Sequence, residues 1–337
     1  MNTLFEDDRE SFFSKLISVF IHFYGVRGSI PTPMRSTEFK EKCLKILREF
    51  TKQGHTAKKD LNAFWEELPD SLKYIVGGNS TCIHIQSEAG NHYIIDAGTG
   101  ARVLGEDLLP KILGNMKEPF PLKYFFTHTH WDHIQGLPFF KPAYFPQSVI
   151  DFYSPLEDLE ARLSYQMDTR FFPIHFEDTA SRKIFHKMEV GTTLEFPDGL
   201  KVETHPLKHP GGSYAYKFTE NGKSFIFATD AEFTGTDMKY ISEITPFFKN
   251  AEVLVLDSQY TLDESFGKFD WGHTSYTMAV NCATQWGVKN LFLTHHEPVY
   301  TDEKIYSIYT EAKDHRDALH SDHLKIHLAR EGIRIQL

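Results

Sequence analysis

The sequence predicts an α+β fold in which two similar layers of strands and helices are built around one centre. Short runs rich in β-branched and aromatic residues recur in both halves of the chain, with helical patterns between them. The 337 residues are enough for one large domain, and the 41% apolar share, with 29 Phe, is enough for a buried core. No repeat or low-complexity linker divides the chain, so we expect a single domain over residues 1–337.

The first half opens with a short helix at residues 8–17 and a strand at 18–24, which the Gly-Pro-rich segment 25–33 interrupts. Apolar residues at a spacing of three to four then predict helices at 36–51 and 59–67. A turn follows at Gly77-Gly78-Asn79. The remaining elements expected in this half are strands at 81–86, 92–96, 122–127 and 148–153 and helices at 101–113 and 156–167.

The second half repeats the mixture of short strands and helices. The strands expected there are 192–196, 200–204, 213–219, 224–229, 252–257 and 290–294. The helices expected there are 274–286 and 302–318, and the tail after residue 323 forms one or two short strands.

Composition narrows the choice of compartment and partner. The formal net charge is −10 and no basic patch stands out, which weighs against a long nucleic acid but not against a small anion at a metal site. Cys43, Cys82 and Cys282 form no close pair, which is typical of a reducing compartment. The acidic N-terminus lacks the basic region of a signal peptide, and the apolar run at 12–24 is too short to span a bilayer. We therefore expect a cytoplasmic protein without a membrane partner.

The strongest chemical signal is the segment 127–133, Thr-His-Thr-His-Trp-Asp-His, which follows the strand expected at 122–127. Its imidazoles and carboxylate are the ligands that borderline divalent metals prefer, and a fold that needed only packing would not place them beside a buried strand. On a sharp loop His128 and His130 can serve one metal while Asp132 and His133 serve a second. The alternative is a chance His-rich surface loop.

With this motif, the sequence resembles the metallo-β-lactamase superfamily, which implies a four-layer αββα sandwich with metals at one edge between the sheets. The resemblance then assigns further ligands by their context. His209 in His-Pro-Gly-Gly is favoured over His205, Asp230 ends the strand at 224–229 and bridges both metals, and His295 is favoured over His296 after the last long strand. Asp96, at the end of another strand, orients the ligand loop without binding metal. The implied ligand set is His128, His130 and His209 for one metal and Asp132, His133 and His295 for the other, with Asp230 between them.

Further segments of the sequence resemble a bacterial subfamily related to tRNase Z and to cyclic-nucleotide phosphodiesterases. They include the segments 23–31, 76–82, 96–100 and 127–140. In the tRNase Z-like group a carboxylate orients a histidine that protonates the leaving oxygen, and the resemblance carries these roles to Asp257 and His273. The alternative is that His273 caps or supports the helix expected at 274–286. Leu256 departs from the pattern, because relatives often have His there.

The resemblance implies a hydrolase that cleaves a small phosphodiester, such as a cyclic nucleotide, by attack of a hydroxide held by Asp132, Asp230 and two divalent metals. Zinc is the expected metal, with manganese or iron as alternatives. Thioester or lactone hydrolysis and a tRNase Z-like ribonuclease remain alternative functions, although the sequence has no long Gly-Pro-rich arm. By analogy a homodimer is one expectation. The segment at about 33–74 is a helical insertion, either an inert decoration, a lid or a dimer contact, and Trp131 either walls the site or stacks on a nucleobase.

Overall fold

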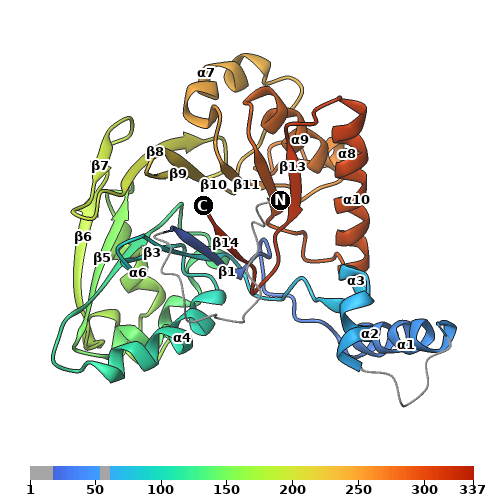
Figure 1. Ribbon diagram of the computed structural model, residues 1–337. Helices are drawn as coiled ribbons and strands as arrows, with labels where there is room; N and C mark the ends of the chain where they lie inside the picture. Colours follow the sequence, from blue (N-terminus) through green and yellow to red (C-terminus); the bar gives the residue numbers. More distant parts are fainter. Residues whose placement is uncertain (1–17, 54–60) are drawn as a thin grey trace.

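The computed structural model describes residues 18–53 and 61–337 and shows a four-layer αββα sandwich (Figure 1). Two seven-stranded sheets face each other, and helices lie against their outer faces. This confirms the predicted fold class, including the two similar layers. The helix predicted at 8–17 and the first two residues of the helix predicted at 59–67 lie outside the described residues.

The first sheet has the strand order β14-β1-β2-β3-β4-β5-β6. Strands β14, β1, β2 and β3 pair antiparallel, and strands β3 to β6 pair parallel. The bounds are β1 Phe20–Gly25, β2 Cys82–Gln86, β3 His92–Ile95, β4 Phe120–Phe125, β5 Ser148–Ser154, β6 Arg182–Lys187 and β14 Arg334–Gln336. Parallel pairing places the ends of β3, β4 and β5 at one edge of the sheet, where the His-rich loop begins.

The second sheet repeats this arrangement with the order β13-β12-β11-β10-β9-β8-β7. Strands β7 to β10 pair antiparallel, and strands β10 to β13 pair parallel. The bounds are β7 Thr193–Glu195, β8 Lys201–Leu207, β9 Ser213–Glu220, β10 Lys223–Ala228, β11 Val253–Asp257, β12 Asn290–Thr294 and β13 Lys325–Leu328. The ends of β10, β11 and β12 therefore meet at one edge of this sheet as well.

Aromatic side chains hold the two sheets together. Phe23 of the first sheet stacks on Phe292 of the second, with ring centroids 5.5 Å apart, and Phe125 meets Tyr216 at the same distance. A separate buried cluster fills the space between the first sheet and helix α4 (Gly100–Gly114). On the other side, α9 (Tyr276–Gln285) and α10 (Asp302–Ala318) lie against the second sheet. The ring-rich cores explain the high aromatic content, because each ring buries a large apolar area.

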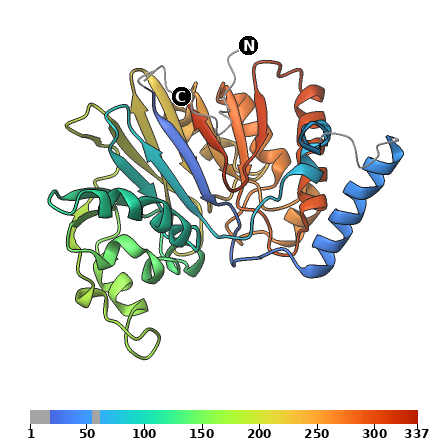
Figure 2. The same ribbon diagram turned by 60° about the horizontal axis from the view of Figure 1, so that its bottom comes forward.

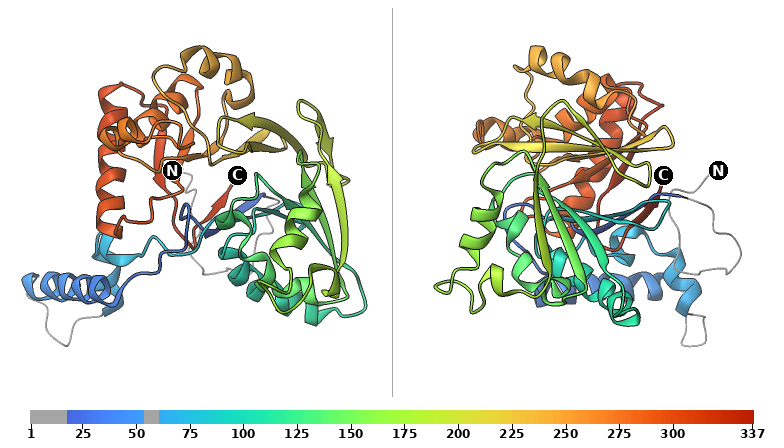
Figure 3. Two further views of the ribbon diagram at one scale, coloured as in Figure 1. Left: turned by 180° about the vertical axis from the view of Figure 1, so that it is seen from behind. Right: turned by 90° about the vertical axis from the view of Figure 1, so that its left-hand side faces the viewer.

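Residues 33–53 and 61–74 form an arm at the side of the sandwich (Figures 2 and 3). It contains α1 (Ser36–Lys52), α2 (Leu61–Glu67) and α3 (Asp70–Lys73), and α1 has no buried residue. Lys45 pairs with Glu303 at the start of α10, with 2.6 Å between Nζ and Oε2. The arm is therefore attached beside α10.

Several elements were not predicted. Strand β6 was missed because four of its six residues are basic, so it lacks the alternating apolar pattern of a strand. Helix α7 (Met238–Phe248) was missed because it contains Pro246. The short helices α5 (Trp131–Ile134) and α8 (Leu262–Gly267) were also missed, and α6 begins three residues later than predicted, at Leu159–Gln166. Among the described helices, none combines the length and apolar content needed to cross a bilayer.

Candidate metal centre

The site lies where loops from both sheets meet. His128 and His130 follow β4, and Asp132 and His133 lie in α5 directly after them. From the second sheet, His209 lies between β8 and β9, Asp230 follows β10, and His295 follows β12. The strand ends thus bring together all seven residues that the resemblance assigned as ligands.

These seven residues form two adjoining groups of donor atoms. His128, His130, His209 and Asp230 each offer a ligand atom within 4.8 Å of the others, and Asp132, His133 and His295 do the same. Asp230 faces both groups. Its Oδ1 is 3.7 Å from Nε2 of His128 and 3.7 Å from Nε2 of His209. Its Oδ2 is 3.0 Å from Nε2 of His133 and 3.2 Å from Nε2 of His295. One carboxylate therefore spans the two groups.

The Nδ1 atoms of four imidazoles already have oxygen partners. The Nδ1 of His133 is 2.7 Å from Oδ2 of Asp96, and that of His209 is 2.9 Å from the carbonyl oxygen of Gly272. The Nδ1 atoms of His128 and His295 contact Oγ1 of Thr127 at 3.0 Å and Oε1 of Gln259 at 3.2 Å. A hydrogen bond at Nδ1 leaves the lone pair of Nε2 free to bind a metal. His130 is the exception, since its Nδ1 is 3.1 Å from Nε2 of His209.

The donor atoms fit divalent cations. Nε2 of His128, Nε2 of His133 and Oδ2 of Asp230 are buried and make no hydrogen bond within the described part of the chain. Although the last two atoms are only 3.0 Å apart, they lack hydrogen-bond geometry. Buried polar atoms without partners are costly, and here they converge on a common point. Cations at that point would satisfy them.

Charge leads to the same conclusion. Burial alone raises the pKa of Asp132, but the nearby His133 outweighs it, so the pKa of this carboxyl lies well below its usual range. Burial likewise opposes protonation of His133, yet Asp230, Asp132 and Asp96 together raise its pKa well above the usual value. The buried carboxylates of Asp132 and Asp230, whose pKa values both lie well below the usual range, demand positive charge, either from a protonated imidazole or from bound cations.

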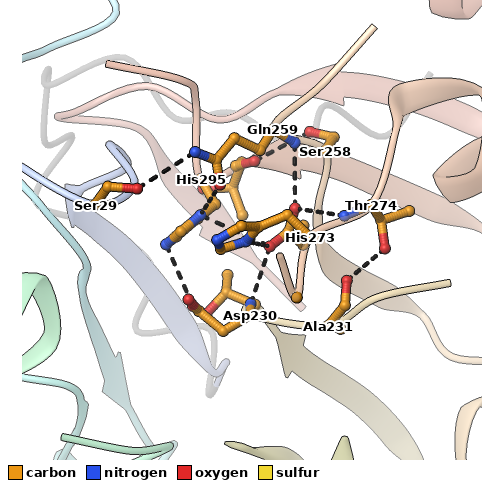
Figure 4. Close-up of polar contacts among 12 residues, drawn as sticks. Ser29, Asp230, Ala231, Ser258, Gln259, His273, Thr274 and His295 are labelled. Carbon is orange, nitrogen blue, oxygen red and sulfur yellow. Dashed lines mark hydrogen bonds and ion pairs between the residues drawn. The ribbon is translucent and has the colours of Figure 1, made fainter. Parts of the chain in front are cut away.

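His273 lies beside Asp230 and His295 (Figure 4), and Asp257 contacts His273. Oδ2 of Asp257 is 2.8 Å from Nδ1 of His273 and accepts a hydrogen bond from the backbone N–H of Asp230 at 3.0 Å. Helix α9 is capped by the Ser275 hydroxyl, which accepts from the N–H of Met278, so the alternative role of His273 as its N-cap is wrong. A cleft of about 420 Å³ is lined by Ser29, Thr129, His130, Trp131, Asp132, Asp230 and His273.

The structure adds residues that the sequence did not single out. The backbone N–H of Ser29 donates to Oδ2 of Asp132 at 2.8 Å, and Gln259 holds His295. Gly28 packs so closely that a Cβ atom there would lie 2.4 Å from Nδ1 of His295. These contacts use a backbone amide, a neutral side chain and a missing side chain, none of which stands out as a metal-binding motif.

Other histidines lie outside both groups. The Nε2 of His296 is 3.1 Å from the carbonyl oxygen of Ala329, and His205 packs on Phe247. His315 hydrogen-bonds Asn281, and His327, which lies in strand β13 on the edge of the second sheet, hydrogen-bonds Asn290. Each has a structural partner of its own.

A family described as "beta-lactamase superfamily domain" matches residues 91–296, more than half of the chain. The protein named ribonuclease Z from Oceanobacillus iheyensis is 24% identical over 299 residues, which cover 73% of this chain and 91% of that relative.

Solved structures share the fold. YhfI from Bacillus subtilis, a metallo-β-lactamase fold protein, superposes with a TM-score of 0.57 at 15% identity, covering 95% of this chain and 99% of the other. A diphosphatase of the PhnP family gives a TM-score of 0.55 at 17% identity, covering 95% and 98%.

Proposed function

The chain belongs to the β-lactamase superfamily as a metal-dependent hydrolase, and from this membership we propose that it is a phosphodiesterase with two divalent metals, most simply zinc. Its substrate would be a small phosphodiester such as a cyclic nucleotide. The proposal takes residues 1–337 as one domain and the segment at 33–74 as an insertion. One observation carries it: the 2.8 Å contact between Asp257 and His273, beside both groups of metal donors.

We propose that His128, His130 and His209 hold one metal and Asp132, His133 and His295 the other, with Asp230 shared. Bound divalent cations supply Lewis acidity toward the phosphoryl oxygens and lower the pKa of water. Asp132 lines the cleft with one oxygen fixed by the N–H of Ser29, so it can orient an attacking water molecule. Asp96 holds His133 in place through Nδ1 and takes no direct part.

His273 is the residue that can protonate the leaving oxygen. Because Nδ1 faces Asp257, Nε2 is the ring nitrogen available to the substrate in the cleft. The buried carboxylate holds the ring through Nδ1 and fixes the tautomer that remains after the proton is donated. An alkoxide is a poor leaving group that needs such a donor, whereas the thiolate of a thioester leaves without one, so the pair favours cleavage of an ester over a thioester.

A ribonuclease of the ribonuclease Z kind is the second candidate, because the relative from Oceanobacillus iheyensis carries that name. The net charge of −10 favours a small substrate over a long polyanion. Assays with 2′,3′- and 3′,5′-cyclic nucleotides beside a precursor RNA, on protein whose zinc content is measured, would separate the two.

The direct test replaces His273 with Ala in the zinc-loaded protein. We expect cleavage of 3′,5′-cyclic AMP to fall roughly 10²- to 10⁴-fold, the usual contribution of a general acid. Bis-p-nitrophenyl phosphate should lose much less, since p-nitrophenolate leaves without a proton. Equal losses on both substrates would refute the role of His273 as a general acid. Wild-type protein that holds zinc but cleaves neither substrate would overturn the proposed phosphodiesterase function.

A further inference from the structure

The mouth of the cleft carries an exposed indole side chain. Trp131, at the first position of α5, is 81% exposed, the highest value among the large apolar side chains of the described chain. It lines the cleft together with His130, Asp132 and His273. No ring or cation contact of this indole occurs among the residues that the structure describes. Trp131 therefore contributes nothing to the core and faces the space where substrate binds.

The position of Trp131 is fixed by the metal-binding loop. His130 and Asp132 flank it in sequence, and the turn is closed by a hydrogen bond from the N–H of His133 to the carbonyl oxygen of His130 at 3.0 Å. The next three residues of α5 are all buried, so Trp131 is the only side chain of this helix that faces solvent. The loop therefore fixes the backbone of Trp131 beside the metal-binding residues and leaves its indole exposed to a substrate.

A second exposed indole comes from the other half of the molecule. Trp271, 61% exposed, precedes Gly272, whose carbonyl oxygen is 2.9 Å from Nδ1 of His209. Lys268 lies 5.8 Å from the centroid of Trp271, and exposed Phe269 has Lys208 at 5.1 Å. Both lysines pair with carboxylates, Lys268 with Glu297 at 3.5 Å and Lys208 with Glu232 at 3.2 Å, so they bring no net positive charge to this loop. Trp271 is also not among the residues that line the cleft, which leaves Trp131 as the indole that faces it.

We propose that Trp131, at the mouth of the cleft, binds a flat aromatic ring of the substrate. The preferred substrates are then phosphodiesters that carry a nucleobase or an aryl group, and this rests on the proposed function. Every nucleobase offers a π-face, and an exposed indole gains apolar contact when a base stacks on it. Because the indole is continuous with the catalytic cleft, a ring of the substrate is favoured over a protein partner as the group that binds to it.

The test compares adenosine 5′-monophosphate with ribose 5-phosphate, which carries a hydroxyl group in place of the base. Binding to the zinc-loaded protein is measured by calorimetry, so the result does not depend on catalysis. We expect the nucleotide to bind roughly 5- to 150-fold more tightly, the range of one stacked base. Trp131→Ala should reduce this ratio to about one, and Trp131→Phe should restore most of it.

Phe39→Ala is the matched control, because Phe39 is a comparably exposed ring on the arm; this variant should keep the wild-type ratio. A wild-type ratio near one, or a ratio that Trp131→Ala leaves unchanged, would overturn the inference. If the wild type is a dimer, Trp131→Ala is a monomer, and the ratio is unchanged, then the indole mediates contact between copies of the chain. That result would also overturn the inference. Failure to cleave any phosphodiester, with the ratio intact, would overturn only the proposed function.

Discussion

Asp257→Asn tests the connection between the general acid and the metal-binding residues. The side chain of Asp257 is fully buried, and its two oxygens have separate partners. Oδ1 accepts from the backbone N–H groups of Gln259 and Thr274, both at 3.2 Å. Oδ2 faces the N–H of Asp230 and Nδ1 of His273. An asparagine keeps one acceptor oxygen and places an NH₂ group against the other pair.

The two possible orientations of the amide have different costs. If NH₂ replaces Oδ1, two backbone N–H groups lose their acceptor, at about 1–3 kcal/mol each. If NH₂ replaces Oδ2, only the N–H of Asp230 is left unpaired, because a neutral His273 can change tautomer and accept at Nδ1. The second orientation is therefore favoured, with a fall of about 1–3 kcal/mol in the free energy of unfolding. In this second orientation, a proton on Nδ1 of His273 would point at the NH₂ group of the asparagine, so the protonated form of His273 is disfavoured.

We therefore expect kcat on 3′,5′-cyclic AMP to fall roughly 10²- to 10⁴-fold while the variant stays folded. Steady-state kinetics and urea unfolding of the zinc-loaded protein measure the two effects. Asp198→Asn is the matched control, since this carboxylate accepts hydrogen bonds from Ser87, Asn91 and Tyr93 in another part of the fold. It should lower stability without changing kcat. If Asp257→Asn keeps kcat within about threefold of the wild type, the reasoning from the tautomer is wrong.

Two further substitutions address the metal groups. Asp132→Ala should reduce turnover by at least roughly 10²- to 10³-fold, because it removes a carboxylate at the attacking side of the cleft; kcat and circular dichroism check this, and normal activity would refute the mechanism. Asp96→Asn should weaken zinc binding by roughly 10- to 100-fold, because His133 loses the acceptor that fixes its ring; competition with a chelator measures this, and an unchanged zinc affinity would mean that Asp96 does not orient the ligand.

Much of the architecture could be predicted from local patterns. Each sheet is formed mainly by runs of β-branched and aromatic residues bounded by turns, and the four-layer sandwich followed from the motif of His128 to His133. The elements that were missed lack the sequence patterns by which strands and helices are predicted. Strand β6 is an edge strand paired only with β5, so its basic residues reach solvent and no apolar alternation is required. Helix α7 contains Pro246 in its last turn, where proline lacks the N–H that would bond back to Ser242, so the sequence there argues against a helix.

The order of polar residues after strands also selected the residues that the structure brings together, but it could not reveal how their backbones turn. Asp96, Asp230 and His295 directly follow or lie near strand ends and have φ values of 57°, 57° and 60°. A left-handed backbone conformation costs of order 1–3 kcal/mol in each residue other than Gly, and the residue type alone does not show where it occurs. Ser29, with φ of 60°, shows the same conformation at the N–H that contacts Asp132. Strain, buried carboxylates and unpaired imidazole nitrogens are thus concentrated at one point, so the folded chain without cations carries a cost there that bound cations would offset.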